Sequence, residues 1–174
     1  MKHIIICGER QVGKSTLISR LQAELTVPVY GVITKIMRKR EDGFHEIYMF
    51  RPDDRERRIS EANHLADSDS VNRRVSAELF ETMGVELIRE ARPGGVIILD
   101  ELGFMEASSP LFCNAVLSAF DGDIPVLAAV KRGFENVDFL NRIKAHPKAD
   151  LYMIDQNNRD ELYTELLPRV RGWN

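Results

Sequence analysis

The chain reads GERQVGKS over residues 8–15, directly after the apolar run from His3 to Cys7. These eight residues fit the pattern G-x-x-x-x-G-K-[S/T] at every fixed position. The β-branched run before them predicts a strand buried on both faces. From Ser15 to Leu25, apolar residues then recur with helical spacing, which predicts a helix. Strand, loop and helix in this order are the context in which the pattern forms a P-loop, and the stretch therefore predicts a nucleoside triphosphate site in an α/β fold.

The residue types in this loop suit phosphate oxygens. Glycines let successive backbone N–H groups turn inward, and the helix that begins there adds the positive end of its dipole. The Lys14 ammonium, expected to be an exposed charge, should reach the β- and γ-phosphates and act in catalysis, and the Ser15 hydroxyl should bind Mg²⁺. The residues expected to contact the nucleotide here are Gly8, Glu9, Arg10, Gln11, Val12, Gly13, Lys14, Ser15 and Thr16.

The interior of the loop departs from the common pattern. Many P-loops carry small residues where this chain has Glu9-Arg10-Gln11. A similar acidic-Arg-Gln run occurs in P-loops of rotary ATPase subunits, some of which bind nucleotide without hydrolysing it. The sequence therefore predicts nucleotide binding more firmly than turnover.

A second apolar run, residues 96–99, ends at Asp100-Glu101 and resembles a Walker B strand. A carboxylate at the end of such a strand faces the metal ion that the P-loop serine binds, so Asp100 is the candidate on the metal side. Glu101 is the candidate general base for an attacking water. The alternatives are a turn residue for Asp100 and a surface carboxylate for Glu101.

Outward from these motifs, short apolar runs alternate with segments of helical spacing along the whole chain. We expect strands at 3–7, 29–36, 96–99, 125–130 and 151–154, and helices at 15–25, 74–91, 110–120, 137–145 and 160–170. Asp42-Gly43 predicts a hairpin turn that leads back through 44–50, and the polar segment 51–71 is interpreted as a mobile loop. The pattern predicts one domain, 1–174, with a mainly parallel sheet, helices on both faces and a β-hairpin excursion.

The composition excludes several classes of protein. The net charge is -3, from 24 Lys and Arg against 27 Asp and Glu, which does not indicate nucleic-acid binding. No apolar stretch approaches the roughly 20 residues of a membrane helix. The two cysteines, Cys7 and Cys113, show no metal-ligand spacing. These features predict a cytoplasmic protein without a membrane partner.

Two pairs of basic residues are weaker candidates for phosphate contacts. Arg73 and Arg74 precede a predicted helix, where an arginine can swing onto the γ-phosphate or simply be solvated. Lys131 and Arg132 follow the strand 125–130 and so emerge at the edge of the sheet that carries the loop. They are interpreted either as phosphate contacts or as loop charges.

The segment after the last predicted strand offers candidates for the base. Asn158 and Arg159 are placed to stack on or hydrogen-bond the nucleobase, although helix capping explains Asn158 equally well. Residues 157–160, NNRD, are not the guanine-reading N-K-x-D, so strict GTP specificity is not expected.

Residues 99–106, LDELGFME, resemble the D-E-[IL]-G-x-[ML]-E signature of a small nucleoside-triphosphatase family known from thermophiles and, in vertebrates, as the cancer-related NTPase. Further similarities follow in the same order: YGVIT at 30–34 resembles the family's G-F-x-T strand, Phe80-Glu81 its F-E, and NRD at 158–160 its N-R-[DN]. The family's G-[KQ]-Y block is replaced by NRR at 72–74.

The resemblance implies a RecA-like P-loop fold and slow, Mg²⁺-dependent hydrolysis of NTPs to NDPs with loose base preference. Two other functions stay open at this point. A kinase acting on a nucleoside or another small hydroxyl compound would share the alternating fold and the P-loop. A nucleotide-binding switch with little turnover would suit the unusual loop interior. The adjacency of Asp100 and Glu101 favours the activation of water, and hence hydrolysis.

Overall fold

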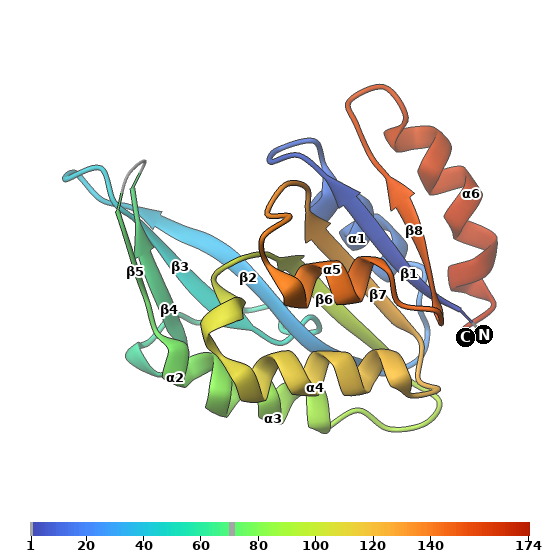
Figure 1. Ribbon diagram of the computed structural model, residues 1–174, viewed down its shortest axis with the longest axis horizontal. Helices are drawn as coiled ribbons and strands as arrows, with labels where there is room; N and C mark the ends of the chain where they lie inside the picture. The colour runs from blue at the N-terminus through green and yellow to red at the C-terminus, as the bar shows by residue number, and fades with distance from the viewer. Residues whose placement is uncertain (1, 70–71) are drawn as a thin grey trace.

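The computed structural model describes residues 2–69 and 72–174, and in these residues eight strands form one sheet in the order β5-β4-β3-β2-β6-β7-β1-β8 (Figure 1). Five neighbouring strands are parallel to one another and make up one side of the sheet. They are β1 (His3–Gly8), β2 (Val29–Lys39), β6 (Val96–Leu102), β7 (Val126–Lys131) and β8 (Ala149–Met153).

The P-loop strand β1 lies inside the parallel part of the sheet. It pairs with β7 on one side and β8 on the other, and every one of its residues is buried. A strand surrounded in this way has no polar face, which explains its continuous apolar run. Ile4 and Ile6 belong to one apolar cluster and Ile5 to the other, because successive side chains point to opposite faces.

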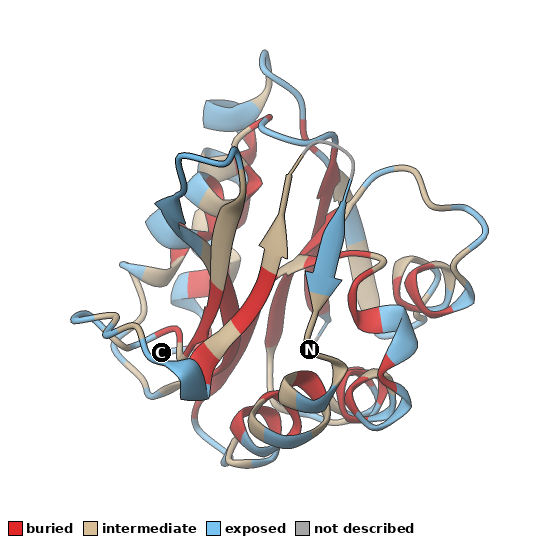
Figure 2. Ribbon diagram, turned by 90° about the vertical axis from the view of Figure 1, so that its left-hand side faces the viewer, coloured by how far each residue is buried: buried red, intermediate tan, exposed pale blue. Residues whose placement is uncertain are grey.

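Helices cover both faces of the sheet, as parallel strands require. One apolar cluster contains residues of α1 (Lys14–Gln22) and α6 (Arg159–Arg171), and the other those of α3 (Val85–Arg89), α4 (Pro110–Asp121) and α5 (Asp138–Lys144). Figure 2 shows buried residues concentrated on the strands between these two layers. In the described part of the chain, no helix has the length and apolarity needed to cross a bilayer. The predicted α/β fold, with its mainly parallel sheet and helices on both faces, is confirmed.

The β-hairpin excursion is also confirmed and extends the sheet beyond its parallel part. The second half of β2 pairs antiparallel with β3 (His45–Phe50), with Lys39 opposite His45. Gly43 forms the turn with φ 87°, a left-handed conformation that suits glycine.

Two predictions for the next segment are wrong. The expected loop 51–71 contains a short 3₁₀ turn, Glu61–Asn63, and a strand, β4 (His64–Ser68), which pairs with β3; positions 70 and 71 of that prediction lie outside the described residues. The helix expected from Arg74 begins later, because β5 (Arg73–Val75) pairs with β4. After β5 come α2 (Ala77–Leu79), a π-helical turn (Phe80–Gly84) and α3. β4 and β5 are short, lie at the antiparallel end of the sheet and bury few apolar residues, so they leave no clear alternating pattern in the sequence.

Candidate functional site

The P-loop connects β1 to α1, and its lysine is folded back against it. Lys14 Nζ donates to the carbonyl oxygens of Gly8 at 3.0 Å and Glu9 at 2.6 Å. Lys14 is only 3% exposed, so the expectation of an exposed charge is wrong. This burial lowers the pKa of Lys14. In this structure two carbonyl oxygens at the start of the loop thus hold the ammonium.

The large residues inside the loop do not prevent it from wrapping. Glu9, Arg10 and Gln11 are exposed and point away from the core, whereas Val12 is buried. Gln11 adopts φ 63° and Gly13 φ 103°. A left-handed backbone costs a non-glycine residue roughly 1–2 kcal/mol. The loop therefore adopts its conformation with a strained backbone at Gln11, where many P-loops have a small residue. Thr16 lies exposed in the first turn of α1.

Ser15 and Asp100 meet at the carboxyl edge of the sheet. Ser15 Oγ donates to Asp100 Oδ1 at 2.9 Å, and the Asp100 side chain is 2% exposed. A hydroxyl and a carboxylate are oxygen ligands of the kind that Mg²⁺ takes alongside phosphates and waters, so the residues present fit this ion. Among the described residues no group of three or more His, Cys, Asp or Glu side chains gathers as a metal site.

Glu101 has a different charged partner from Asp100 and lies at a bulge in β6. Leu99 lies opposite Ala128 but Leu102 lies opposite Val130, so β6 carries one extra residue in this stretch. Glu101 adopts φ 68°, and its Oε2 lies 3.8 Å from Lys131 Nζ. Its side chain is 36% exposed and lines a cleft, where it is accessible to a water molecule.

The cleft beside Glu101 has a volume of about 330 Å³ and borders the outer residues of the P-loop. Lys131, Arg132 and Arg73 line it together with Phe104 and Phe134. The two rings lie 5.1 Å apart, and the Arg73 guanidinium carbon is 4.7 Å above the Phe104 ring. Of the paired basic candidates, three therefore border the cleft. Arg74 lines a separate hollow on β4 and β5, as the alternation of side chains along β5 requires.

Asn158 and Arg159, at the start of α6, make different contacts. The Asn158 side chain accepts from the Asp155 N–H at 2.9 Å and donates to the Met153 carbonyl at 2.8 Å, so it fastens the turn after β8 instead of capping α6. The Arg159 side chain lies against the P-loop: a Cβ atom at Gly13 would come within 2.7 Å of Arg159 Cδ.

Two residues of this region were not singled out from the sequence. Lys35 Nζ forms an ion pair with Asp100 Oδ2 at 3.0 Å. Glu106, the last residue of the LDELGFME block, is 2% exposed and accepts from the Gly103 N–H at 2.9 Å, which ties down the loop after Glu101. Burial raises the pKa of Glu106. The block itself signalled Glu106, whereas a lysine inside a hairpin strand reads as an ordinary surface charge.

Comparison with known proteins gives similarity along nearly the whole chain. A family model described as NTPase matches residues 3–167. The nucleoside-triphosphatase THEP1 of Methanocaldococcus jannaschii is 33% identical over 175 residues, covering 96% of each chain, and that of Thermotoga maritima is 31% identical, covering 94% of this chain and 92% of the relative.

Two solved structures share the fold. THEP1 from Aquifex aeolicus superposes with a TM-score of 0.73 at 21% identity, covering 97% of this chain and 98% of the other. A human cancer-related nucleoside triphosphatase superposes with a TM-score of 0.72 at 22% identity, covering 99% and 98%. The P-loop, the strand end at Asp100 and the surrounding sheet are thus parts of a fold shared along its full length, and the chain belongs to the NTPase family.

Proposed function

We propose that the protein is a Mg²⁺-dependent nucleoside triphosphatase that releases the terminal phosphate of an NTP, slowly and with loose base preference, in the cytoplasm. Membership of the NTPase family and relatives named nucleoside-triphosphatase support the reaction class. The observation that carries the proposal is the Ser15–Asp100 hydrogen bond, because it joins the P-loop helix to the end of β6 at the place where a metal-bound triphosphate belongs.

Different residues bind the phosphates and the metal ion. Backbone N–H groups of the P-loop and the start of α1 hold phosphate oxygens, and the Lys14 ammonium neutralises part of their charge. Ser15 and Asp100 would hold Mg²⁺, which when bound neutralises the charge that develops on the phosphate oxygens. Arg159, which lies against Gly13, is placed to contact the nucleotide from the α6 side.

Glu101 acts as the general base that activates the attacking water. Its carboxylate accepts a proton from a water in the cleft as the water oxygen forms a bond to the terminal phosphorus. The bond from that phosphorus to the bridging oxygen breaks, and the nucleoside diphosphate leaves with the bridging oxygen. General-base catalysis of this kind typically contributes about 10²–10⁴-fold. Lys131, 3.8 Å from Glu101, orients the carboxylate toward the cleft.

The kinase and switch alternatives predict different results for phosphate release. A kinase releases little phosphate until a hydroxyl acceptor is added, and a switch binds nucleotide tightly without turnover. Phosphate release from ATP, GTP, CTP and UTP with Mg²⁺ alone, at comparable rates, is the expected result. No release from any of the four would contradict hydrolysis.

Lys14→Ala tests the assignment of the phosphate site. We expect this variant to lose productive triphosphate binding and phosphate release, because Lys14 is the ammonium that the loop itself holds and that should reach the phosphates. Its fold should persist, since only two loop carbonyls lose a donor. Lys39→Ala, an exposed lysine of β2, is the matched control and should keep both activities. Equal nucleotide affinity of wild type and a folded Lys14→Ala protein, measured by titration calorimetry, would refute the assignment.

A further inference from the structure

Both oxygens of the Asp100 carboxylate are engaged in this structure. Oδ1 accepts from the Ser15 hydroxyl at 2.9 Å, and Oδ2 pairs with Lys35 Nζ at 3.0 Å. Lys35 and Asp100 lie 65 residues apart, on neighbouring strands of the sheet. The Lys35 side chain is 25% exposed and the Asp100 side chain 2%. Lys35 is thus the ammonium in direct contact with this buried carboxylate, and the charge of Lys14 acts on it from farther away.

The same carboxylate is required to face a divalent cation when substrate binds, as proposed above. An ammonium 3.0 Å from Asp100 and a divalent ion at the Ser15 side of that carboxylate repel each other across a few ångströms. Burial makes this repulsion stronger than it would be in water. The ion pair seen here and the metal-bound state are therefore competing arrangements of one carboxylate.

Once displaced from Asp100, the Lys35 ammonium needs another anion as its partner, and two candidates are the neighbouring Glu101 and the incoming nucleotide. Glu101, the adjacent carboxylate, lines the cleft and faces Lys131. The anion that would arrive together with the metal is the triphosphate, and its terminal phosphate is the group that a diphosphate lacks. A lysine suits such an exchange, because its charge sits on a flexible four-carbon stem and its three donors accept varied geometries. A quarter of the Lys35 side chain is already in solvent, which leaves it room to move.

We propose that Lys35 is an exchanging counter-ion that determines specificity for triphosphates. In the nucleotide-free protein it neutralises Asp100, and when the metal-bound triphosphate enters it transfers to an oxygen of the terminal phosphate. A diphosphate has no γ-phosphate, so Lys35 favours binding of the triphosphate over the diphosphate. This inference rests on the metal position of the proposed function.

The decisive measurement is the ratio of two affinities, for the imido analogue of ATP and for ADP, both with Mg²⁺. In Lys35→Met, affinity for the imido analogue should fall about tenfold or more, as expected for a lost contact between charged groups, while affinity for ADP should not fall, because its metal ion no longer meets a competing ammonium. Lys35→Arg should retain most of the preference, because its cation reaches the same oxygens. Lys39→Met, on the same strand but exposed, should leave the ratio unchanged.

A second measurement addresses the exchange itself, without nucleotide. Mn²⁺ binding followed by electron paramagnetic resonance should be tighter in Lys35→Met than in wild type, because the ammonium no longer competes for Asp100. If Lys35→Met does not fold, Lys35→Gln serves for both measurements. A purely structural ion pair would lower thermal stability and leave both the affinity ratio and Mn²⁺ binding unchanged, which would overturn the inference.

Neither measurement requires turnover, so the result is separable from the proposed hydrolysis. A wild-type protein that binds both nucleotides but releases no phosphate would contradict hydrolysis alone, and the affinity ratio would still test Lys35. Equal losses of imido analogue and ADP affinity in Lys35→Met would overturn the role of Lys35 while leaving hydrolysis intact.

Discussion

Single residues of the site hold backbone conformations that cost free energy. Gln11 and Glu101 both have positive φ, at 63° and 68°, although neither is glycine. Each such residue costs roughly 1–2 kcal/mol, and strained residues of this kind concentrate at functional sites. At Glu101 the strain coincides with the bulge of β6. Strain at these two positions therefore shapes the phosphate loop and aims the candidate base.

Glu101→Gln separates binding from chemistry. We expect nucleotide affinity near wild type, because the amide keeps the size of the side chain and Glu101 is not among the proposed metal-side residues. Hydrolysis should slow by roughly 10² or more, because the amide does not accept the proton of the attacking water. Single-turnover hydrolysis beside equilibrium nucleotide titration measures both. Loss of affinity and rate together would place Glu101 at the metal, and loss of neither would make it a surface residue.

Ser15→Ala and Asp100→Ala test the metal side. Each variant should need a higher Mg²⁺ concentration for half-maximal hydrolysis, because each removes an oxygen near the expected ion. Asp100→Asn is the more conservative variant, since it keeps the shape but lowers the charge. The assignment fails if a nucleotide-bound structure shows the ion with neither group directly bound or bound through a water.

At the scale of elements, a close backbone contact joins two strands and a side-chain cap joins two helical elements. β2 approaches β6 at Gly31, where φ is 103° and an added Cβ would lie 2.2 Å from the Ile98 carbonyl oxygen. On the helical side, Glu81 Oε1 accepts from the Leu111 N–H at the start of α4. Each contact belongs to a stretch that resembles the family, YGVIT and Phe80-Glu81, and each joins two elements rather than forming part of the phosphate site.

Gly31→Ala should be strongly destabilising because the new methyl group meets the backbone of a neighbouring strand. We expect a loss of more than about 3 kcal/mol in the free energy of unfolding, from the clash and the positive φ together. Gly43→Ala is the matched control: it also has positive φ, at 87°, but open space around it, so about 1 kcal/mol is expected. Chemical denaturation of both variants gives the comparison. Similar losses would show that strain, not contact between β2 and β6, determines the effect.

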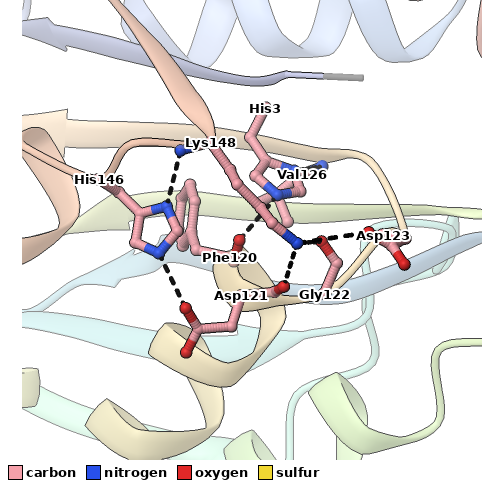
Figure 3. A network of polar contacts seen from close by, with 8 residues as sticks. All are labelled: His3, Phe120, Asp121, Gly122, Asp123, Val126, His146 and Lys148. Carbon is pink, nitrogen blue, oxygen red and sulfur yellow. Dashed lines mark hydrogen bonds and ion pairs between the residues drawn. The ribbon is translucent and has the colours of Figure 1, made fainter.

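At the scale of the whole molecule, a polar network connects the amino-terminal ends of inner strands, at the end of the sheet opposite the phosphate site (Figure 3). His3 Nε2 donates to the Phe120 carbonyl oxygen at 2.9 Å, and its Nδ1 accepts from the Val126 N–H at 3.1 Å. The same network includes His146, which pairs with Asp121, and Lys148, which donates to carbonyls at the end of α4. It thus joins the beginnings of β1 and β7 to α4.

This network should make stability depend on pH. Burial lowers the pKa of His3, and the nearby His146 and Lys148 lower it further. The neutral ring is the form that both hydrogen bonds require, so the unfolded chain takes up a proton more readily than the folded one. The stabilisation is present above about pH 6.5, the ordinary histidine pKa, and is lost as pH falls through the lowered value in the folded protein.

Urea unfolding of wild type and His3→Gln between about pH 7 and pH 5 measures this effect. The variant should be less stable at pH 7 and should lose less stability on acidification than wild type. His45→Gln, in the hairpin, is the control and should follow wild type. Equal pH dependence of wild type and His3→Gln would rule out His3 as the titrating group.

The sequence by itself determined the parts whose signal is local. The P-loop, the buried strands that alternate with helices along the chain and the β2–β3 hairpin were all predicted, because each depends on residues close together in the chain. A parallel strand buried on both faces and a glycine-containing loop have few alternatives in their residue types. The same local signal placed Asp100 and Glu101 at the end of β6.

The tertiary structure alone decided how these parts meet. The Lys35–Asp100 pair joins residues 65 positions apart, and no local pattern distinguishes Lys35 from a solvated lysine. The bulge at Glu101 is defined by pairing with β7, and only the side-chain direction along β5 separates Arg73 from Arg74. Strands β4 and β5, at the antiparallel end of the sheet, bury too few apolar residues to be predicted from the sequence, because what holds them is hydrogen bonding to neighbouring strands. Backbone pairing and contacts between charges depend on position in space, which periodicity in the sequence does not record.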